Sequence, residues 1–196
     1  MKEVTIGGRK VLYLEEGAGE PLVLLHGWSF NSDDWVRSGI FHMFAKHFKV
    51  YTVEMPYGLK TRSDRFTAAR REYAKFLRQI LDGLELKDPP LVGPSASGEV
   101  VLWYVALGLP TRAAVVIGAV GLTTELLTGL SQSKTPILAI WGDRDHISPP
   151  DNARLLQDRA KVVIFKKAGH AAYLDKPEEF VAVVLEFLRE VSQGLA

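Results

Sequence analysis

Apolar and polar positions along this chain follow two patterns, and each pattern predicts one kind of element. Short continuous apolar runs are typical of buried strands, whereas apolar positions three and four apart are typical of helices. The predicted strands are Val4–Ile6, Lys10–Glu15, Pro21–His26, Lys49–Glu54, Pro89–Val92, Ala113–Ala119, Thr135–Trp141 and Lys161–Lys166. The predicted helices are Ser32–Phe48, Thr67–Leu86, Ser97–Leu107, Pro150–Arg159 and Pro177–Val191.

The order of these elements predicts the fold class. Gly7 and Gly8 lie between the first two strands, where a glycine pair indicates a hairpin turn. Strands and helices then alternate, which predicts an α/β protein with a mostly parallel, twisted sheet of about eight strands and helices on both faces. Neither a repeat nor a linker interrupts the pattern, so we expect residues 1–196 to form a single domain.

Composition narrows the classes of partner. The chain is 47% hydrophobic and 24% charged, with a formal net charge of +1. Nucleic acids and membrane surfaces attract concentrated basic patches, so neither is predicted as a partner. The absence of cysteine excludes disulfides and thiolate catalysis. No apolar run reaches the ~18 residues of a membrane span, and a cytoplasmic location is expected.

In a parallel sheet, active sites gather where the strands end, and Ser95 lies at such a point. Gly93, Ser97 and Gly98 are the small neighbours that a tight strand-to-helix turn requires. Such a turn exposes the serine hydroxyl as a nucleophile and directs the amide of Ala96 toward a developing oxyanion. An ordinary helix cap at Ser95 or Ser97 explains the same residues equally well.

A second strand end carries His26, Gly27 and Trp28. The glycine allows a tight turn, and the amide of Trp28 could supply a second oxyanion donor. His26 is interpreted as a structural histidine that holds the loop. The alternative is a strand end that glycine simply terminates.

Two further strand ends carry acids and a histidine. Asp143 and Asp145 follow one strand, and local physics does not decide which of them could orient an imidazole. His170 follows the next strand and would, by itself, be an ordinary surface histidine. Serine, acid and histidine in this order, each directly after a strand, match what a catalytic triad needs.

The segments LLHGW, GPSASG, WGDRDHISPP and AGHAAYLDKPEEF together resemble those of α/β-hydrolase-fold serine hydrolases. The resemblance covers the chain from end to end and implies that Ser95 is the nucleophile and His170 the general base and acid. It implies Asp145 as the acid, because the family acid usually ends a G-x-x-D stretch that begins here at Gly142. No metal site and no cofactor are expected, since the five histidines show no H-E-x-x-H spacing.

The chain resembles most closely the group around α/β-hydrolase-domain-containing protein 14, which shares the P-S-x-S-G turn and a YLDKPEE segment. Two departures from the wider family stand out. Ser97 replaces the usual glycine two positions after the nucleophile, and its extra atoms could tighten the turn or donate a hydrogen bond. The loop from Pro56 to Ser63 differs from the usual P-G-x-G-x-S, so the contacts of that loop are not carried over.

Many members of this family insert a helical lid after the strand that corresponds to Ala113–Ala119. Here only a short stretch reaches Thr135, so at most a short helix and no separate lid domain are expected. An open site favours small acyl groups. Besides Trp28, the candidate walls of the substrate pocket are Phe30, Tyr57, Leu122, Leu126 and Tyr173, for each of which core packing is the alternative.

A basic run from Lys60 to Arg65, continued at Arg70 and Arg71, follows one strand end. It could attract an anionic substrate or acceptor such as coenzyme A, although such runs are more often solvated faces.

The sequence therefore predicts a serine hydrolase that cleaves small carboxylic esters through an acyl-enzyme. Two alternatives stay open. The first is acyl transfer to a thiol or amine acceptor, and the second is a non-catalytic scaffold that keeps the fold without the chemistry. The sequence leaves the oligomeric state open.

Overall fold

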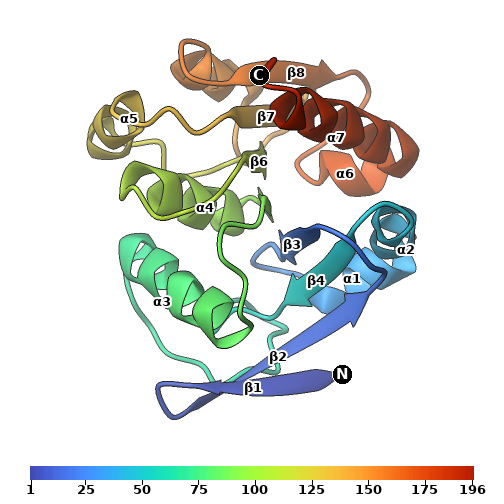
Figure 1. Cartoon of the computed structure of the whole chain (residues 1–196). Coiled ribbons are helices and arrows are strands. Elements are labelled where there is room, and N and C mark those ends of the chain that lie inside the picture. The colour runs from blue at the N-terminus through green and yellow to red at the C-terminus, as the bar shows by residue number, and fades with distance from the viewer.

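Eight strands pair side by side in one sheet in the computed structural model, which describes residues 1–196. Their spatial order is β1-β2-β4-β3-β5-β6-β7-β8 (Figure 1). The strands are β1 (Lys2–Ile6), β2 (Arg9–Glu16), β3 (Pro21–Leu25), β4 (Lys49–Val53), β5 (Leu91–Pro94), β6 (Ala114–Ile117), β7 (Ile137–Gly142) and β8 (Lys161–Phe165). The number of strands agrees with the prediction.

The sheet is mostly parallel, as expected. Only β2 runs against its neighbours, β1 and β4, and every pair from β4 across to β8 is parallel. The order of the chain reverses at β3, because β4 lies on one side of it and β5 on the other. Ligands of open parallel sheets bind beyond the carboxyl ends of the strands at such a reversal.

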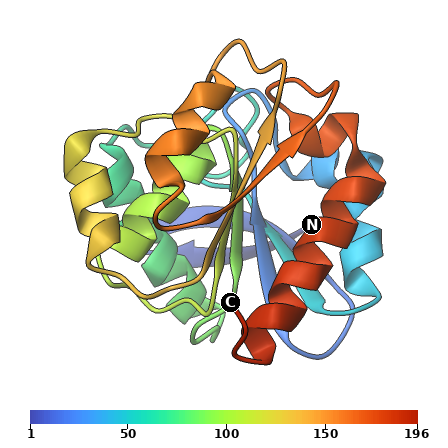
Figure 2. The same cartoon turned by 90° about the horizontal axis from the view of Figure 1, so that it is seen from above.

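Helices cover both faces of this sheet. On one face lie α3 (Arg70–Gly83), α4 (Ala96–Ala106) and α5 (Thr124–Ser131), and on the other lie α1 (Ser32–Arg37), α2 (Ile40–Ala45), α6 (Ala172–Asp175) and α7 (Pro177–Ser192). The two layers are separate in both views, the green and yellow helices on one side and the blue and red helices on the other (Figures 1 and 2). Each layer closes its own hydrophobic core, of 31 and 22 buried residues.

The helix α3 shows how the apolar spacing produces this packing. Its buried residues recur three and four positions apart, at Tyr73, Phe76, Leu77, Ile80 and Leu81. They form one stripe that faces the sheet, as predicted from the sequence. The helix begins later than expected, because residue 69 is still extended, with ψ of 153°.

The single helix predicted at Ser32–Phe48 is wrong. The segment forms two short helices, α1 and α2, which Gly39 separates with a positive φ of 82°. This left-handed conformation is open to glycine and interrupts the regular helical dihedrals. The apolar residues on both sides still face the same core, which explains why their spacing resembled one helix.

The segment predicted as a helix at Pro150–Arg159 is a 3₁₀ helix, η1 (Pro150–Leu156). Its two buried residues, Ala153 and Leu156, are three positions apart. This spacing suits the three residues per turn of a 3₁₀ helix.

The segment between β6 and β7 contains only one short helix, α5, which packs on α4. The expectation that no separate lid domain exists is therefore confirmed. None of the helices has the length and apolar character needed to cross a membrane.

Candidate active site

Ser95 occupies the tight turn between β5 and α4. Its backbone has φ of 54° and ψ of −116°, a conformation that non-glycine residues rarely adopt. The turn tolerates only small neighbours: a Cβ atom on Gly93 would lie 2.5 Å from the carbonyl oxygen of Ser97, and one on Gly98 would lie 3.0 Å from the Cβ of Ala119. The amide of Ser95 donates to the carbonyl of Ile117 at 2.8 Å, which holds the strained residue in place.

Three predicted residues converge beside this turn. The Nε2 atom of His170 lies 2.8 Å from the hydroxyl oxygen of Ser95. The Nδ1 atom of the same ring lies 2.8 Å from a carboxylate oxygen of Asp145. The loops after β7 and β8, drawn in orange, lie together at the upper edge of Figure 2. Because a carboxylate only accepts, Nδ1 carries the proton and Nε2 accepts from the serine hydroxyl.

The carboxylate of Asp145 is held from two sides. The side chain is almost fully buried, with 2% of the residue exposed. Its second oxygen accepts hydrogen bonds from the amides of Ile147 and Ser148, both at 2.9 Å. These bonds fix the carboxylate in the direction of His170.

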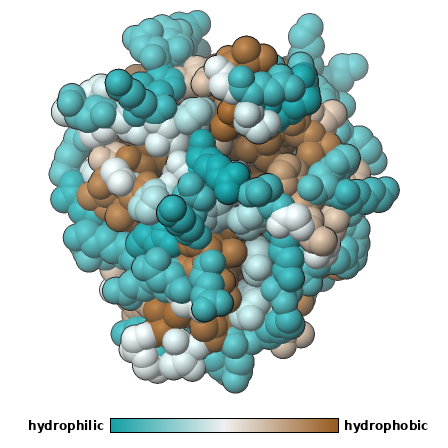
Figure 3. Space-filling model, in the orientation of Figure 1, coloured by the Kyte–Doolittle hydropathy of each residue, from teal (hydrophilic) through white to brown (hydrophobic).

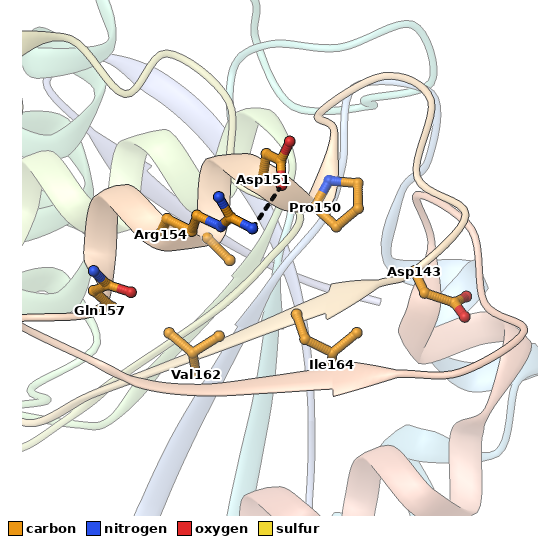
Figure 4. Close-up of a pocket in the computed structure, with 8 residues that line it drawn as sticks. Asp143, Pro150, Asp151, Arg154, Gln157, Val162 and Ile164 are labelled. Carbon is orange, nitrogen blue, oxygen red and sulfur yellow. Dashed lines mark ion pairs between the residues drawn. The ribbon is translucent and has the colours of Figure 1, made fainter.

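Asp143, the other acid that the sequence left open, lies elsewhere. Its carboxylate accepts from the amide of Ala168 at 3.2 Å and supports the turn after β8. It lines a hollow of about 410 Å³ beside β8 and η1, in which Asp151 pairs with Arg154 at 3.7 Å (Figure 4). Of the two acids, only Asp145 contacts the imidazole.

Two backbone amides lie free at the same end of the sheet. The amide of Trp28 has no acceptor within the protein, whereas its carbonyl accepts from the amide of Leu59 at 2.7 Å. Ala96 is the first residue of α4, and the first amides of a helix have no intrahelical partner. The two residues follow β3 and β5, which are neighbours in the sheet.

A small pocket of about 160 Å³ opens onto Ser95. Its lining residues are Gly27, Trp28, Ser29, Phe30, Pro94, Ser95, Ile147, His170, Ala171 and Tyr173. Ile147 was not among the pocket residues predicted from the sequence. It lies two positions after Asp145 and is 69% exposed. Its place in the acid's own loop is the signal that could have identified it.

Among the predicted pocket walls, Phe30 and Tyr173 line this pocket, as does Trp28. Tyr57, Leu122 and Leu126 do not, and their prediction is corrected. Tyr57 and Leu126 are buried in the core under α3, α4 and α5, and Leu122 packs against the same core. Their large apolar side chains serve packing on that face of the sheet.

His26 has the structural role expected from the sequence. Its ring accepts a hydrogen bond from the amide of Met55 at 3.0 Å and lies 3.0 Å from the carbonyl of Gly27, to which Nδ1 donates. Burial lowers the pKa of the ring, so the neutral form is favoured. The histidine thereby ties the loop after β3 to the loop after β4.

Acids neutralise most of the basic run. Arg62 pairs with the buried Glu54 and with Asp33, and its pKa is raised chiefly by the hydrogen bond to Glu54. Arg70 pairs with Glu99, and Arg71 with Glu125. None of these arginines lines the pocket at Ser95.

Larger hollows exist away from Ser95. The largest, of about 1020 Å³, lies at the amino ends of the strands, between Pro21, Pro90 and the end of α7 at Ser192. It is at the opposite end of the sheet from the converging residues and contains no nucleophile–base pair. The molecular face drawn in Figure 3 shows hydrophobic patches separated by hydrophilic side chains.

Comparisons with known proteins identify relatives of this chain. No family model matches the chain. The chain is 30% identical over 196 residues to "Putative protein-lysine deacylase ABHD14B" of Homo sapiens, covering 95% of this chain and 93% of the relative. It is also 30% identical over 188 residues to "Protein ABHD14A" of Homo sapiens, covering 92% of this chain and 68% of the relative.

Solved structures share the fold. A predicted CIB-like hydrolase from Thermoplasma acidophilum superposes with a TM-score of 0.88 at 22% identity, covering 96% of this chain and 97% of that one. A meta-cleavage product hydrolase from Pseudomonas fluorescens superposes with a TM-score of 0.85 at 18% identity, covering 97% of this chain and 98% of that one. The architecture is that of the α/β hydrolases.

Proposed function

The chain belongs to the ABHD14 family of α/β hydrolases, and from this premise we propose that it cleaves small carboxylic esters through an acyl-enzyme. The observation that carries the proposal is the continuous path from the Ser95 hydroxyl through His170 to Asp145, with 2.8 Å at each step. A nucleophile, a base and an orienting acid in this geometry are the parts of a serine hydrolase.

The proposed reaction proceeds in two halves. The hydroxyl oxygen of Ser95 attacks the ester carbonyl carbon while His170 takes the hydroxyl proton. Asp145 stabilises the imidazolium that forms. The tetrahedral intermediate collapses with cleavage of the bond to the alcohol, which receives the proton from His170. Water then attacks the acyl-enzyme and gives a proton to His170, the bond from the acyl carbon to the Ser95 oxygen breaks, and His170 returns the proton to Ser95 as the carboxylic acid is released.

The negative charge that develops on the carbonyl oxygen needs donors. We assign this role to the amides of Trp28 and Ala96, whose strands are adjacent and whose hydrogens are free of other acceptors. Donors of this kind stabilise the transition state because they are already oriented before the charge appears.

The size of the pocket limits the acyl group. Its volume of about 160 Å³ is close to that of a cavity which holds one benzene molecule, roughly 150 Å³. Drug-sized ligands occupy pockets of about 300–1,000 Å³. The enclosed part of the site therefore suits a short acyl group, and a long chain would extend into solvent.

The first prediction concerns this activity. A series of p-nitrophenyl esters from acetate to palmitate should show the highest kcat/KM for the short acyl groups. Ser95→Ala and His170→Ala should each lower kcat by roughly 10⁴-fold or more. Asp143→Asn, the matched control for the acid, should leave kcat nearly unchanged, whereas Asp145→Asn should lower it about 10⁴-fold.

A fluorophosphonate probe gives an independent readout of the same site. It should label Ser95 in the wild type and fail to label His170→Ala. A wild type that stays unlabelled at neutral pH would contradict the proposal and favour a non-catalytic scaffold.

A second candidate is removal of an acyl group from an amine, the activity that the name "Putative protein-lysine deacylase" gives to the ABHD14B relative, or transfer of an acyl group to a thiol or amine acceptor. The observation that favours it is the open rim of the pocket, where Trp28 is 41% and Ile147 69% exposed. Such a rim admits a side chain that projects from a larger molecule. Release of free lysine side chains from acyl-lysine peptides, compared with the ester rate and measured with and without a thiol acceptor, separates the two candidates.

A further inference from the structure

Ser97, the residue that departs from the usual glycine, is fully buried and joins two parts of the site. Its hydroxyl donates a hydrogen bond to the carbonyl of His26, in the loop after β3. Ser97 itself lies in the first turn of α4, directly after Ala96. One side chain thus connects the segment of one proposed oxyanion donor to the segment of the other.

Tyr57 extends this connection. Its hydroxyl lies 2.5 Å from the hydroxyl oxygen of Ser97. A carbonyl only accepts, so the proton of Ser97 is directed to His26 and the tyrosine must donate to Ser97. The tyrosine ring also stacks on the ring of Trp28, with centroids 6.1 Å apart and planes 6° from parallel.

Trp28 needs such support because its own amide is unpaired. The loop that carries it is held through its carbonyl, by the amide of Leu59, and through the ring of His26. Neither contact reaches α4. The chain Tyr57–Ser97–His26 is the polar link between the Trp28 loop and the helix that begins at Ala96.

We propose that Ser97 and Tyr57 are positioning residues that fix the separation and direction of the two oxyanion donors, the amides of Trp28 and Ala96. This inference rests on the proposed function. Neither side chain lines the pocket, so both act through the backbone they hold and not through substrate. Their loss should weaken binding of the transition state more than binding of the ester itself.

The experiment removes one hydroxyl at a time. Ser97→Ala should lower kcat for a short p-nitrophenyl ester about 10- to 100-fold, with KM changed less than about threefold, because a small misplacement of donors acts on the transition state. Tyr57→Phe should lower kcat in the same way by about 3- to 10-fold. The double variant should be no slower than Ser97→Ala, since both changes break one connection.

Matched controls remove the same groups elsewhere. Ser63 is buried and its hydroxyl donates to the carbonyl of Glu54, and Tyr104 is buried and its hydroxyl donates to the carbonyl of Pro110. Ser63→Ala and Tyr104→Phe should leave kcat within about threefold of the wild type.

A second readout does not depend on catalysis. Backbone order parameters from NMR should be near 0.85 for Gly27 and Trp28 in the wild type and should fall toward about 0.6 in Ser97→Ala. Unchanged kcat in both single variants overturns the inference. A lower kcat with unchanged order parameters overturns it too, as do lower order parameters with an unchanged kcat.

Two further outcomes are decided by the same design. If Ser97→Ala does not fold, the same two measurements on Tyr57→Phe decide the inference. If the wild type turns over no ester, the proposed function fails, and the order parameters alone decide whether Ser97 and Tyr57 hold the loop.

Discussion

At the scale of single residues, the sequence predicted some of the side chains at the ends of strands and left others open. Ser95 and His170 could be identified because small neighbours and chain order mark their positions. Local physics left the choice between Asp145 and Asp143 open, and the family resemblance favoured Asp145. The structure agrees with that choice, because only Asp145 contacts the imidazole of His170. Tyr57 was misplaced because sequence does not reveal that its hydroxyl is used by Ser97.

The second prediction concerns His26, whose buried ring has a lowered pKa. The unfolded chain binds a proton near pH 6.5 and the folded ring resists it, so the contribution to stability is present above about pH 6.5 and is lost as the pH falls. The free energy of unfolding should therefore drop between pH 7 and pH 5.5, by up to about 1.4 kcal/mol per pH unit from this group.

Urea unfolding at several pH values measures this slope. His26→Gln should flatten the slope, while His47→Gln, which changes an exposed histidine, should leave it as in the wild type. Equal slopes for wild type and His26→Gln would show that burial of His26 has no part in the acid sensitivity.

At the scale of elements, strands were predicted well and helix ends less well. Apolar runs identified the central strands β3 to β7, because a strand that is covered on both faces must be apolar on both. The more exposed strands β1 and β2 were identified with the help of the glycine pair between them. The break at Gly39 was not predicted, because the apolar residues on both sides of it face one core and keep a helical spacing across it. The left-handed conformation of this one glycine interrupts the helix, although the apolar spacing on both sides of it is helical.

The third prediction tests this break. Gly39→Ala should destabilise the protein by about 1–2 kcal/mol, because a side chain in the left-handed region crowds its own backbone. A Cβ atom there would meet only the end of Met43, at 3.9 Å, so the cost is conformational and not one of space. Gly39→Asn should cost less, since asparagine tolerates this region, and an equal loss for both variants in urea unfolding would refute the explanation.

At the scale of the whole molecule, the sheet separates two cores that share no side chains. Its position also explains the site: the reversal of chain order at β3 brings the loop of Trp28 beside the turn of Ser95. This reversal was not visible in the sequence, since an apolar pattern gives the strands but not their neighbours.

The fourth prediction concerns the independence of the two cores. Ile80→Val, on α3, and Ile40→Val, on α2, should each cost about 0.5–1.5 kcal/mol. The sites lie on opposite faces of the sheet, so the double variant should lose the sum of the two within about 0.5 kcal/mol. A larger deviation in chemical denaturation would show that strain passes through the sheet.

The short connection between β6 and β7 affects how the rate should depend on the concentration of a poorly soluble ester. In the proposed reaction, no lid domain has to be displaced at an oil–water boundary before Ser95 can attack an ester. The rate should rise smoothly with the concentration of dissolved ester and level off when the solution is saturated. Emulsified droplets should bring neither a sudden acceleration nor a lag.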